Sequence, residues 1–413
     1  MSEGEAVTNG TGRAVRLAIL VAALGYFVDI YDLILFSFVG KASLRDMGVD
    51  PAAIDSTYEH IFNVQMLGML TGGLVWGILG DKKGRLSVLF GSILMYSLAN
   101  VANGFLETTT YYAHLRFVAG VGLAGELGAG VTLVGELMSK SSRGWGTTII
   151  AGVGVTGALV AGLIDSLVTW RTAYFIGGGM GLALLLLRVG VTESGMFESV
   201  KQDKAVSRGN FFMLFSDGTR ALRYVCVLLS GVPIWYLLGI LVIRAPKLAK
   251  DFGITEPVTG RTAIMLAYLG LAIGDLGSGV VSQLLKSRRR AVAAFIALAG
   301  AACIFYFVAG RSSPQLLYVS CFLAGLGGGY WAVFVTMASE QFGTNLRSTV
   351  TTTAPNFVRG SLVLVSMFVA AIEPAFGVWK AAAAAGVVCI VVALVALIPL
   401  RESFGKDLNF NEQ

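Results

Sequence analysis

The segment Phe117-Val-Ala-Gly-Val-Gly122 recurs 205 residues later as Phe322-Leu-Ala-Gly-Leu-Gly327. The same charges return around each copy: a basic loop before it, and an acid and an arginine seven residues apart after it. The paired positions are Arg85 with residues 288–290, Glu136 with Glu340, and Arg143 with Arg347. A near-constant offset at three separate places predicts a duplicated chain built from two parallel halves.

The composition places this chain in a lipid bilayer. Of its 413 residues, 55% are hydrophobic and only 14% are charged, and the mean hydropathy is +0.74. A soluble domain needs roughly a quarter of charged residues to cover its surface. The 53 glycines are also in excess, and we interpret them as packing positions because small residues let membrane helices approach closely.

Twelve stretches are long and apolar enough to cross a membrane, which takes about 20 mostly apolar residues. They cover residues 15–39, 59–80, 86–106, 110–138, 145–166, 170–190, 220–243, 262–284, 289–309, 314–338, 349–372 and 377–399. The longest interior polar stretch, residues 191–219, is interpreted as a cytoplasmic linker between two bundles. These bundles cover residues 15–190 and 220–399, with an N-terminal segment at 1–14 and a tail at 400–413.

The sequence therefore predicts an all-α membrane protein with twelve transmembrane helices in two pseudo-symmetric six-helix halves. Of its 31 Lys and Arg residues, 20 fall on the side of the termini (Arg188 among them), nine on the other side and two inside spans. Basic residues concentrate in cytoplasmic loops, so we expect both termini in the cytoplasm. The start without a cleavable signal is typical of a bacterial inner-membrane protein. Parallel halves around a midplane site are a transporter architecture.

Several other functions are disfavoured. The four cysteines show no C-x-x-C or C-x-x-H spacing, so neither a metal site nor a disulfide framework is expected. No G-x-x-x-x-G-K-[ST] loop is present, so ATP is not the driver. The basic residues cluster in loops rather than in a stripe that would bind nucleic acid. A nucleophile–base set for an enzyme and a large output domain for a sensor are both missing, and we expect no cofactor.

The loop after the second span carries the most specific motif. Residues 77–85 read Gly-Ile-Leu-Gly-Asp-Lys-Lys-Gly-Arg and fit the pattern G-x-x-x-D-[RK]-x-G-[RK]. Gly84 would supply a tight turn, and Asp81 could pair with a basic residue or cap the start of a neighbouring helix. The motif resembles the loop signature of the major facilitator superfamily, and a degenerate second copy has Gln283 in place of the acid.

This resemblance covers about residues 15–400 and implies the major facilitator fold, in which two halves rock around a central site. It also implies that the loop is part of a gate that holds one conformation. The gating residues that we assign on this basis are Gly77, Asp81, Lys82, Gly84, Arg85, Glu136, Arg143, Glu340 and Arg347.

Three further motifs resemble those of metabolite:proton and aromatic-acid:proton symporters and of organic-ion transporters, and the first two of them are also similar to motifs of sugar porters. Asp29 and Asp32 form a D-x-x-D pair, and residues 116–126 fit R-F-x-x-G-x-G-x-G-G-E except at Ala124. Residues 340–347 resemble E-x-[FY]-P-T-x-x-R with Gly343 in place of proline. Asn356 and Arg359 follow this last motif, as the downstream arginine does in those transporters.

Charged residues inside the spans each need a partner or a function, because each costs roughly 2.5–3.5 kcal/mol in a bilayer. Counting from the outer ends at about 1.5 Å per residue puts Asp32 level with Arg116, and Asp275 level with Arg359. These are the two predicted pairs, and a permanent structural ion pair is the alternative to a functional role. The six residues are Asp29, Asp32, Arg116, Glu126, Asp275 and Arg359.

We assign proton coupling to Asp29, Asp32, Arg116 and Glu126, with Glu126 alternatively a structural group. Arg359 suits a substrate carboxylate because its donors can bind two oxygens at once, unless Asp275 neutralises it permanently. The mid-span aromatics could wall a cavity or could simply pack between helices. The predicted substrate-binding set is Arg359, Tyr236, Tyr330, Trp331, Asp275 and Asn356.

The sequence thus predicts a proton-coupled symporter of a small organic anion, such as a mono- or dicarboxylate or an aromatic acid, that works by alternating access. Its partners would be the anion, protons and the bilayer, and it would act as a monomer. The first rival is a sugar or polyol symporter, which would need polar side chains in the nearly apolar seventh span. The second rival is an organic cation or drug:proton antiporter, which Arg359 argues against.

Overall fold

The structure, a computed structural model, describes residues 3–139, 143–188 and 209–412, and their side chains from Val15 onward. The described residues form helices and connecting turns, and twelve helical segments are long and apolar enough to cross a membrane. This confirms the predicted number of spans and the all-α fold. Most of the predicted linker lies outside the described residues; its last part contains the short helix η3 (Phe211–Phe215) and the start of the seventh span.

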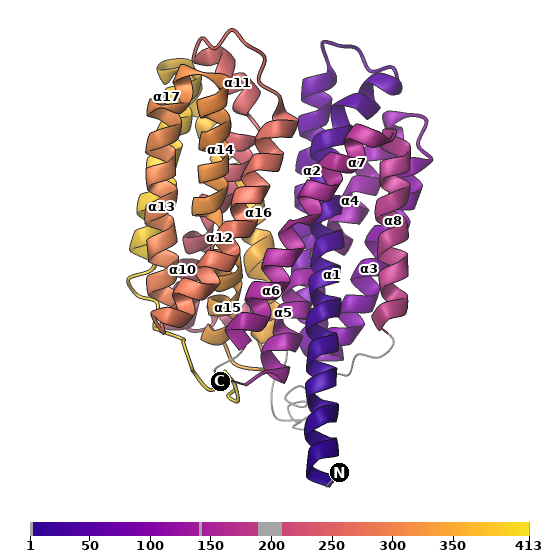
Figure 1. Cartoon of the computed structure of the whole chain (residues 1–413), viewed down its shortest axis with the longest axis vertical. Helices are drawn as coiled ribbons and strands as arrows, with labels where there is room; N and C mark the ends of the chain where they lie inside the picture. Colours follow the sequence, from indigo (N-terminus) through magenta and orange to yellow (C-terminus); the bar gives the residue numbers. More distant parts are fainter. Residues whose placement is uncertain (1–2, 140–142, 189–208, 413) are drawn as a thin grey trace.

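The helices fall into two groups that stand side by side, as Figure 1 shows. The first group contains α1 (Glu3–Asp46), α2 (Ile54–Lys83), α3 (Arg85–Gly104), α4 (Tyr112–Leu123), α5 (Glu126–Leu137), α6 (Arg143–Val155), α7 (Gly157–Leu167) and α8 (Trp170–Leu187). The second contains α10 (Gly218–Tyr236), α11 (Ala245–Asp251), α12 (Gly260–Leu284), α13 (Arg288–Val308), α14 (Pro314–Gly328), α15 (Trp331–Gln341), α16 (Arg347–Phe376) and α17 (Val378–Ala396). Both chain ends lie at the same end of the bundle, which we call the base.

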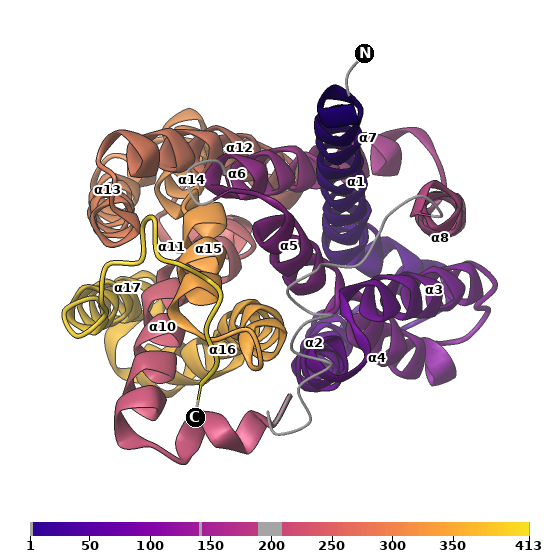
Figure 2. The same cartoon turned by 90° about the horizontal axis from the view of Figure 1, so that it is seen from below.

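The two groups meet along two pairs of helices. Seen from below, α2 lies against α16 and α6 lies against α12, while α5 and α15 come together between them (Figure 2). Three spans are interrupted: the fourth is split into α4 and α5, the fifth into α6 and α7, and the tenth into α14 and α15. Each of the three is still a single span at the predicted place, and the break inside it is a feature that hydropathy does not predict.

The repeated glycines explain why each half packs as it does. A Cβ atom on Gly120 of α4 would lie 2.3 Å from the carbonyl oxygen of Gln65 on α2. Its repeat, Gly325 of α14, would place a Cβ 1.8 Å from the carbonyl oxygen of Ala267 on α12. The same glycine therefore lets the same two helices touch backbone to backbone in both halves, which is why the segment recurs in the sequence.

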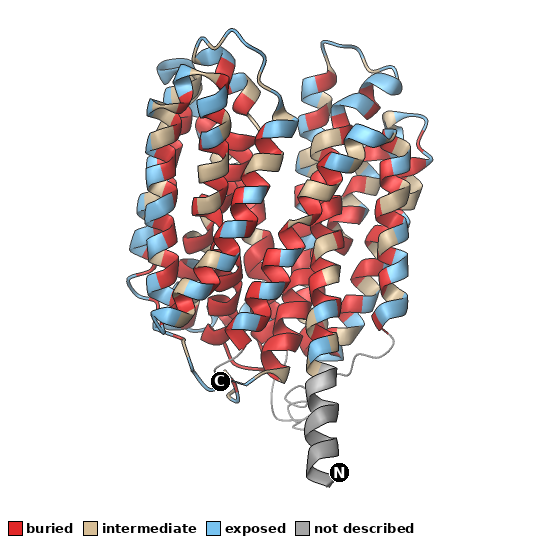
Figure 3. Ribbon diagram, viewed as in Figure 1, coloured by how far each residue is buried: buried red, intermediate tan, exposed pale blue. Residues whose placement is uncertain are grey.

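Burial follows the expected membrane pattern. Figure 3 shows buried residues concentrated where helices face each other, with exposed residues on the outer sides. The exposed positions there are largely apolar: Leu186 of α8 and Leu284 of α12 are each 77% exposed, and Ile304 of α13 is 68% exposed. Such a surface suits lipid and would be unfavourable in water.

We expect Gly325→Ala to lower the thermal unfolding temperature of the detergent-solubilised protein by several degrees. The added methyl group meets main chain, which cannot rotate away, so α12 and α14 must separate. Gly179→Ala on α8 is the matched control, because a Cβ there meets no atom within 4 Å. An equal effect of both changes would contradict the assignment of Gly325 as a helix contact.

Candidate transport site and base latch

Two helix interruptions lie opposite each other in the interior. Between α4 and α5 the carbonyl of Ala124 accepts a hydrogen bond of 2.9 Å from the side chain of Asn356 on α16. Between α14 and α15 the amide of Ala332 donates to the carboxylate of Asp275 on α12, at 3.0 Å. Main-chain amides and carbonyls that lose their helical hydrogen bonds inside a membrane protein must form other hydrogen bonds of this kind. Interrupted helices of this kind commonly line transport sites.

Arg359 lies between the two interruptions and is 1% exposed. Its Nη1 donates to Asn356 at 3.2 Å, and its guanidinium lies 5.5 Å from the ring centre of Trp331, the first residue of α15. Its Nη2 is 3.8 Å from the carboxylate of Asp29 on α1. A residue of the second half is thus neutralised by an acid of the first half.

The predicted pair of Asp275 with Arg359 is wrong. Asp275 caps the first turn of α15, and the acid that faces Arg359 is Asp29. Equal depth in the membrane fixes the height of a side chain but not the direction in which it leaves its helix. Two acids that both approach the centre therefore cannot be distinguished by their depth alone.

Several buried polar atoms around Arg359 make no hydrogen bond within the protein. They are both carboxylate oxygens of Asp29, Nε and Nη2 of Arg359, Nε1 of Trp331 and Oδ2 of Asp275. Buried polar atoms are nearly always paired, so a group of unused donors and acceptors of both kinds needs an explanation. Such a group could bind a small molecule that carries a carboxylate, which accepts from Arg and Trp donors.

The predicted neighbours Asp32 and Arg116 do come together, but not as a direct ion pair. Asn100 on α3 donates to the carboxylate of Asp32, and it accepts from Nη1 of Arg116 at 3.1 Å. Arg116 also donates to the main-chain oxygen of Asp32 at 3.3 Å and twice to Gln65 on α2, at 3.2 and 3.0 Å. Asn100 and Gln65 were missed, although buried amides inside apolar spans were a signal in the sequence.

Glu126 binds Arg188, the residue after the end of α8. Arg188 was counted among the cytoplasmic loop residues, yet it is 1% exposed and also donates to the carbonyl of Leu89 at 2.7 Å. A Cβ on Gly25 of α1 would lie 1.8 Å from the Glu126 carboxylate, so this glycine makes room for the pair. The structural alternative for Glu126 thus has a defined partner.

Of the three predicted aromatic residues, only Trp331 faces Arg359. Tyr236 donates to the carbonyl of Ala382, and Tyr330 to the carbonyl of Ser230, each at 2.9 Å. Both tyrosines are fully buried within the second half. Their hydroxyl groups are used to join helices, which corresponds to the packing alternative.

The loop motif caps a helix of the other half. The carboxylate of Asp81, at the end of α2, accepts from the amides of Ser348 and Thr349 at 3.0 and 2.8 Å, and from the Thr349 hydroxyl at 2.7 Å. These residues form the first turn of α16, where free amides favour a negative charge. Asp81 is also 3.5 Å from Arg85, so both sequence-based expectations for this acid are met.

The glycines of the motif have separate roles. Gly84 adopts a φ of 102° between α2 and α3, which confirms the predicted turn. A Cβ on Gly77 would lie 3.0 Å from the Cα of Thr349, so this glycine lets α2 approach α16. Lys82, in contrast, is exposed.

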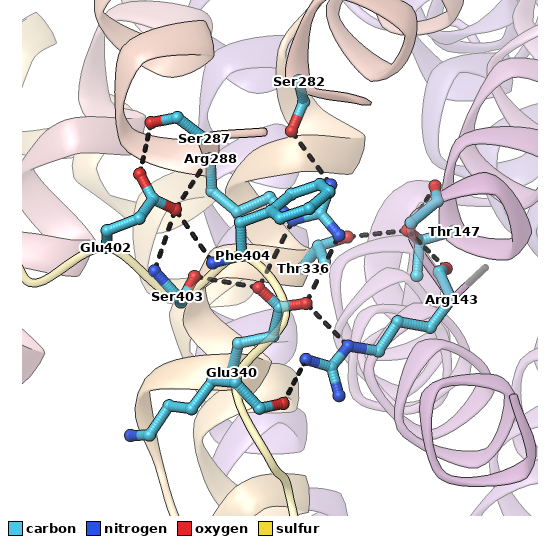
Figure 4. Close-up of polar contacts among 12 residues, drawn as sticks. Arg143, Thr147, Ser282, Ser287, Arg288, Thr336, Glu340, Glu402, Ser403 and Phe404 are labelled. Atoms are coloured by element: carbon cyan, nitrogen blue, oxygen red, sulfur yellow. Dashed lines mark hydrogen bonds and ion pairs between the residues drawn. The ribbon is translucent and has the colours of Figure 1, made fainter. Parts of the chain in front are cut away.

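Each repeated acid at the base is shared by two arginines, one from each half. Glu136 accepts from Arg85 of its own half at 2.8 Å and from Arg347 of the other half at 3.0 Å. Glu340 in turn contacts Arg288 of its own half at 3.3 Å and Arg143 of the other half at 2.8 Å (Figure 4). We call these six residues the base latch, and it closes the base in this structure.

The C-terminal tail is part of the same closure. Ser403 donates to Glu340 at 2.8 Å, and Arg143 donates to the main-chain oxygen of Lys406 at 2.6 Å (Figure 4 shows the first contact). The main-chain oxygen of Leu408 accepts from Arg347. A Cβ on Gly343 would lie 2.6 Å from the amide of Glu412, so the glycine found in place of proline makes room for the tail.

Glu402 anchors the start of the tail to the first turn of α13. Its carboxylate accepts from the hydroxyl of Ser287 and, at 2.9 Å, from the amide of Arg288. Burial acts to raise the pKa of Glu402, but these bonds and those from the amides of Phe404 and Ser403 lower it overall. The carboxylate therefore stays ionised and continues to cap the helix at neutral pH.

Comparison with known proteins identifies the family of the chain. The sequence model of the Major Facilitator Superfamily matches residues 22–354. The chain belongs to this superfamily. The niacin transporter NiaP of Acinetobacter baylyi is 24% identical over 374 residues, which cover 79% of this chain and 80% of that protein. The 3-(3-hydroxy-phenyl)propionate transporter of Escherichia coli is 26% identical over 299 residues, 71% of this chain and 72% of that one.

A solved structure shows the same superfamily fold. The proton:xylose symporter XylE, bound to 6-bromo-6-deoxy-D-glucose, superposes with a TM-score of 0.76 over 97% of this chain and 98% of XylE. Its sequence identity is 16%, so the likeness concerns the fold alone. Like its relatives, this superfamily member is a transporter and not an enzyme.

We expect Asp81→Ala to shift this transporter toward a conformation with an open base. Loss of a helix cap is typically worth about 1 kcal/mol, which corresponds to a roughly fivefold change in the ratio of two states. Spin labels on Lys83→Cys and Lys286→Cys, both exposed at the base of opposite halves, report the separation. The four native cysteines are buried and need not interfere.

Asp55→Asn is the control for this measurement, because Asp55 forms an ion pair with Lys41 and its side chain is 81% exposed. It removes a carboxylate without touching the base. An unchanged distance distribution in Asp81→Ala would show that the cap does not hold the base closed.

Proposed function

We propose that this protein is a proton-coupled symporter of a small organic anion. The observation that carries the proposal is the pair of Arg359 and Asp29, which joins the two halves and is surrounded by unused donors and acceptors. A buried guanidinium held by one acid at 3.8 Å is only loosely neutralised. A carboxylate that binds it with two hydrogen bonds is a better partner.

The relatives support a carboxylic acid as the substrate class. Niacin and 3-(3-hydroxyphenyl)propionate, which appear in the names of two relatives, each join an aromatic ring to a carboxylate. In this chain Arg359 would bind the carboxylate, with Asn356 holding the guanidinium in place. Trp331 would offer its ring and its indole N–H to the rest of the molecule, and Asp275 would fix the turn that carries Trp331.

Proton coupling follows from the charge balance at the centre. With Asp29 ionised, the pair is neutral, and an added anion would leave a net negative charge in a medium of low dielectric constant. With Asp29 protonated, Arg359 is a free cation, and the anion restores neutrality. Proton and anion are thus favoured together, which is the requirement for symport. Asp32 and Arg116 would form a second proton-dependent cluster in the first half, and Glu126 would remain paired with Arg188.

Alternating access would proceed by breaking and remaking the base latch. Opening the base separates Glu136 from Arg347 and Glu340 from Arg143, and each group then meets water rather than an apolar interior. The arginine cluster also fits a cytoplasmic base, in the inner membrane of a bacterium. One chain holds both halves of the site, so a monomer would suffice.

Two rivals are distinguished by substrate charge. A sugar or polyol would not need Arg359, and the likeness to the xylose symporter extends only to the fold. An organic cation would be repelled by Arg359 and would compete with it for Asp29. Uptake should therefore be measured with acids, sugars and cations under the same gradient.

In liposomes, we expect the wild-type protein to accumulate niacin, benzoate or 3-(3-hydroxyphenyl)propionate when the outside is acidic, and not xylose or tetraethylammonium. Asp32→Asn should abolish this accumulation while exchange of labelled for unlabelled acid continues, because exchange needs no net proton movement. Asp50→Asn, in an exposed loop, is the control. Accumulation by Asp32→Asn at the wild-type level would remove Asp32 from the coupling mechanism.

Substitutions of Arg359 should separate the substrate classes. We expect Arg359→Lys to weaken binding of the transported acid about tenfold or more, because a lysine cannot form two parallel hydrogen bonds to the two carboxylate oxygens. Arg359→Ala should abolish binding. Asp29→Asn should keep acid binding but make it independent of pH. Isothermal titration calorimetry in detergent measures the affinity of each variant for the acid, and its dependence on pH.

Arg311→Ala is the matched control for these titrations, because Arg311 also lies 5.5 Å from a tryptophan ring, that of Trp379, but at the protein surface. Unchanged acid affinity in well-folded Arg359→Ala would reject the anion reading of this site and favour the cation antiporter.

A further inference from the structure

Asn100 is the only group that joins the carboxylate of Asp32 to the guanidinium of Arg116 among the contacts of the described residues. Its amide nitrogen donates to Oδ2 of Asp32, and its amide oxygen accepts from Nη1 of Arg116. The other contact of Arg116 with Asp32 goes to the main-chain oxygen, which does not change on protonation. Any effect of the Asp32 charge on Arg116 through hydrogen bonds must pass through Asn100.

The orientation of this amide is fixed by its two neighbours. A carboxylate only accepts hydrogen bonds and a guanidinium only donates them, so the reverse orientation would oppose acceptor to acceptor and donor to donor. Asn100 is fully buried, as are Asp32 and Arg116, so water does not offer the amide an alternative. The amide is therefore a polarised bridge with one allowed direction while Asp32 is ionised.

We propose that Asn100 is the positioning residue that transmits protonation of Asp32 to Arg116. The inference rests on the proposed function, because it presupposes that Asp32, the acid of the second proton-dependent cluster, also binds and releases a proton during the transport cycle. When the proton binds, the bond from Asn100 becomes one between neutral groups, which is roughly half as strong. The new O–H can also donate to the amide oxygen, which turns the amide over and presents its N–H groups to Arg116.

Arg116 then faces the N–H groups of Asn100, which repel its own donors, in place of the amide oxygen that accepted from it. The Asp32 side chain beside it is no longer an anion. The remaining hydrogen bonds of Arg116 go to Gln65 and to the main-chain oxygen of Asp32, and the rings of Phe36 and Tyr174 lie 5.7 and 5.5 Å away. Since Gln65 belongs to α2, which packs against α16, a shift of Arg116 reaches the interface between the halves. The proton would thus change a helix contact and not only a local charge.

None of the other titratable groups around Asp32 can replace Asn100 as the bridge to Arg116. Asp29 and Tyr31 on α1, Tyr96 on α3, Arg116 on α4 and Tyr174 on α8 interact with it electrostatically. Of these only Arg116 is a cation, and none bridges it to Asp32 by hydrogen bonds. At the repeat offset, Asn100 corresponds to Cys303 or Ile304 and Arg116 to Cys321, so the second half cannot form this bridge.

The test compares Asn100→Ala with Asn103→Ala. Asn103 lies one turn along the same helix, is equally buried, and donates locally to the carbonyl of Ala99 at 2.8 Å without touching Asp32 or Arg116. In liposomes, the probe is labelled niacin or 3-(3-hydroxyphenyl)propionate, whichever the wild-type protein accumulates more. Two quantities are measured: accumulation under an inward proton gradient, and exchange without a gradient.

We expect Asn100→Ala to lower accumulation about tenfold or more, the usual weight of a hydrogen bond to a charged group, while exchange changes little. Asn103→Ala should leave the ratio of accumulation to exchange at the wild-type value. Asn100→Ser should restore part of the accumulation, because a hydroxyl can donate to Asp32 and accept from Arg116; it also serves if Asn100→Ala does not fold.

Wild-type accumulation in folded Asn100→Ala, or an equal loss of accumulation and exchange, would overturn the relay. A loss of the same size in Asn103→Ala would overturn it as well, since that residue cannot bridge the pair. If the wild-type protein itself shows no proton-driven accumulation, the proposed function fails instead, and the two failures are thereby distinguished.

Discussion

The structure depends on the rule that a charge buried in a membrane protein must be neutralised. At the base, two acids each hold two arginines at 2.8–3.3 Å, and each acid pairs with one arginine from the opposite half. At the centre, Arg359 is 3.8 Å from its acid and has unused donors. Removing one partner of a buried pair costs about 3–5 kcal/mol, so the tight pairs keep the base closed. The loose pair is the one that a ligand can change.

Duplication has preserved the closing parts of the two halves and let the centre diverge. The base latch repeats almost residue for residue, because both halves must pack against each other in the same way. At the centre, the charged residues of one half have no charged counterpart in the other. The position of the first half that corresponds to Asp275 is near Gly73, and the position of the second half that corresponds to Arg116 is Cys321. The first half contributes Asp29 and the second half contributes Arg359, so neither half contains the complete central pair. A transporter with such a site must use both halves in every cycle.

Local patterns allowed much of this to be predicted. Hydropathy gave twelve spans, and the capping role of Asp81 followed from an acid at a helix end. The direction of side chains around a helix axis is not local, which is why Asp275 was paired with Arg359 in error. Asn100 escaped notice because neutral amides do not stand out among charges in a span. Arg188 was assigned to a loop because it ends a helix, although a buried acid holds it there.

The tail binds the latch mainly through its backbone. Arg143 and Arg347 donate to the carbonyl oxygens of Lys406 and Leu408, and the amide of Thr344 donates to the carbonyl of Phe410. Main-chain acceptors are present whatever the side chain, so residues 406, 408 and 410 can change in sequence while the length and path of the tail are retained. A reporter protein fused close behind the tail would pull on the contacts of the closed base. Affinity tags and fluorescent fusions for this transporter therefore belong on a long flexible spacer, or at the N-terminus.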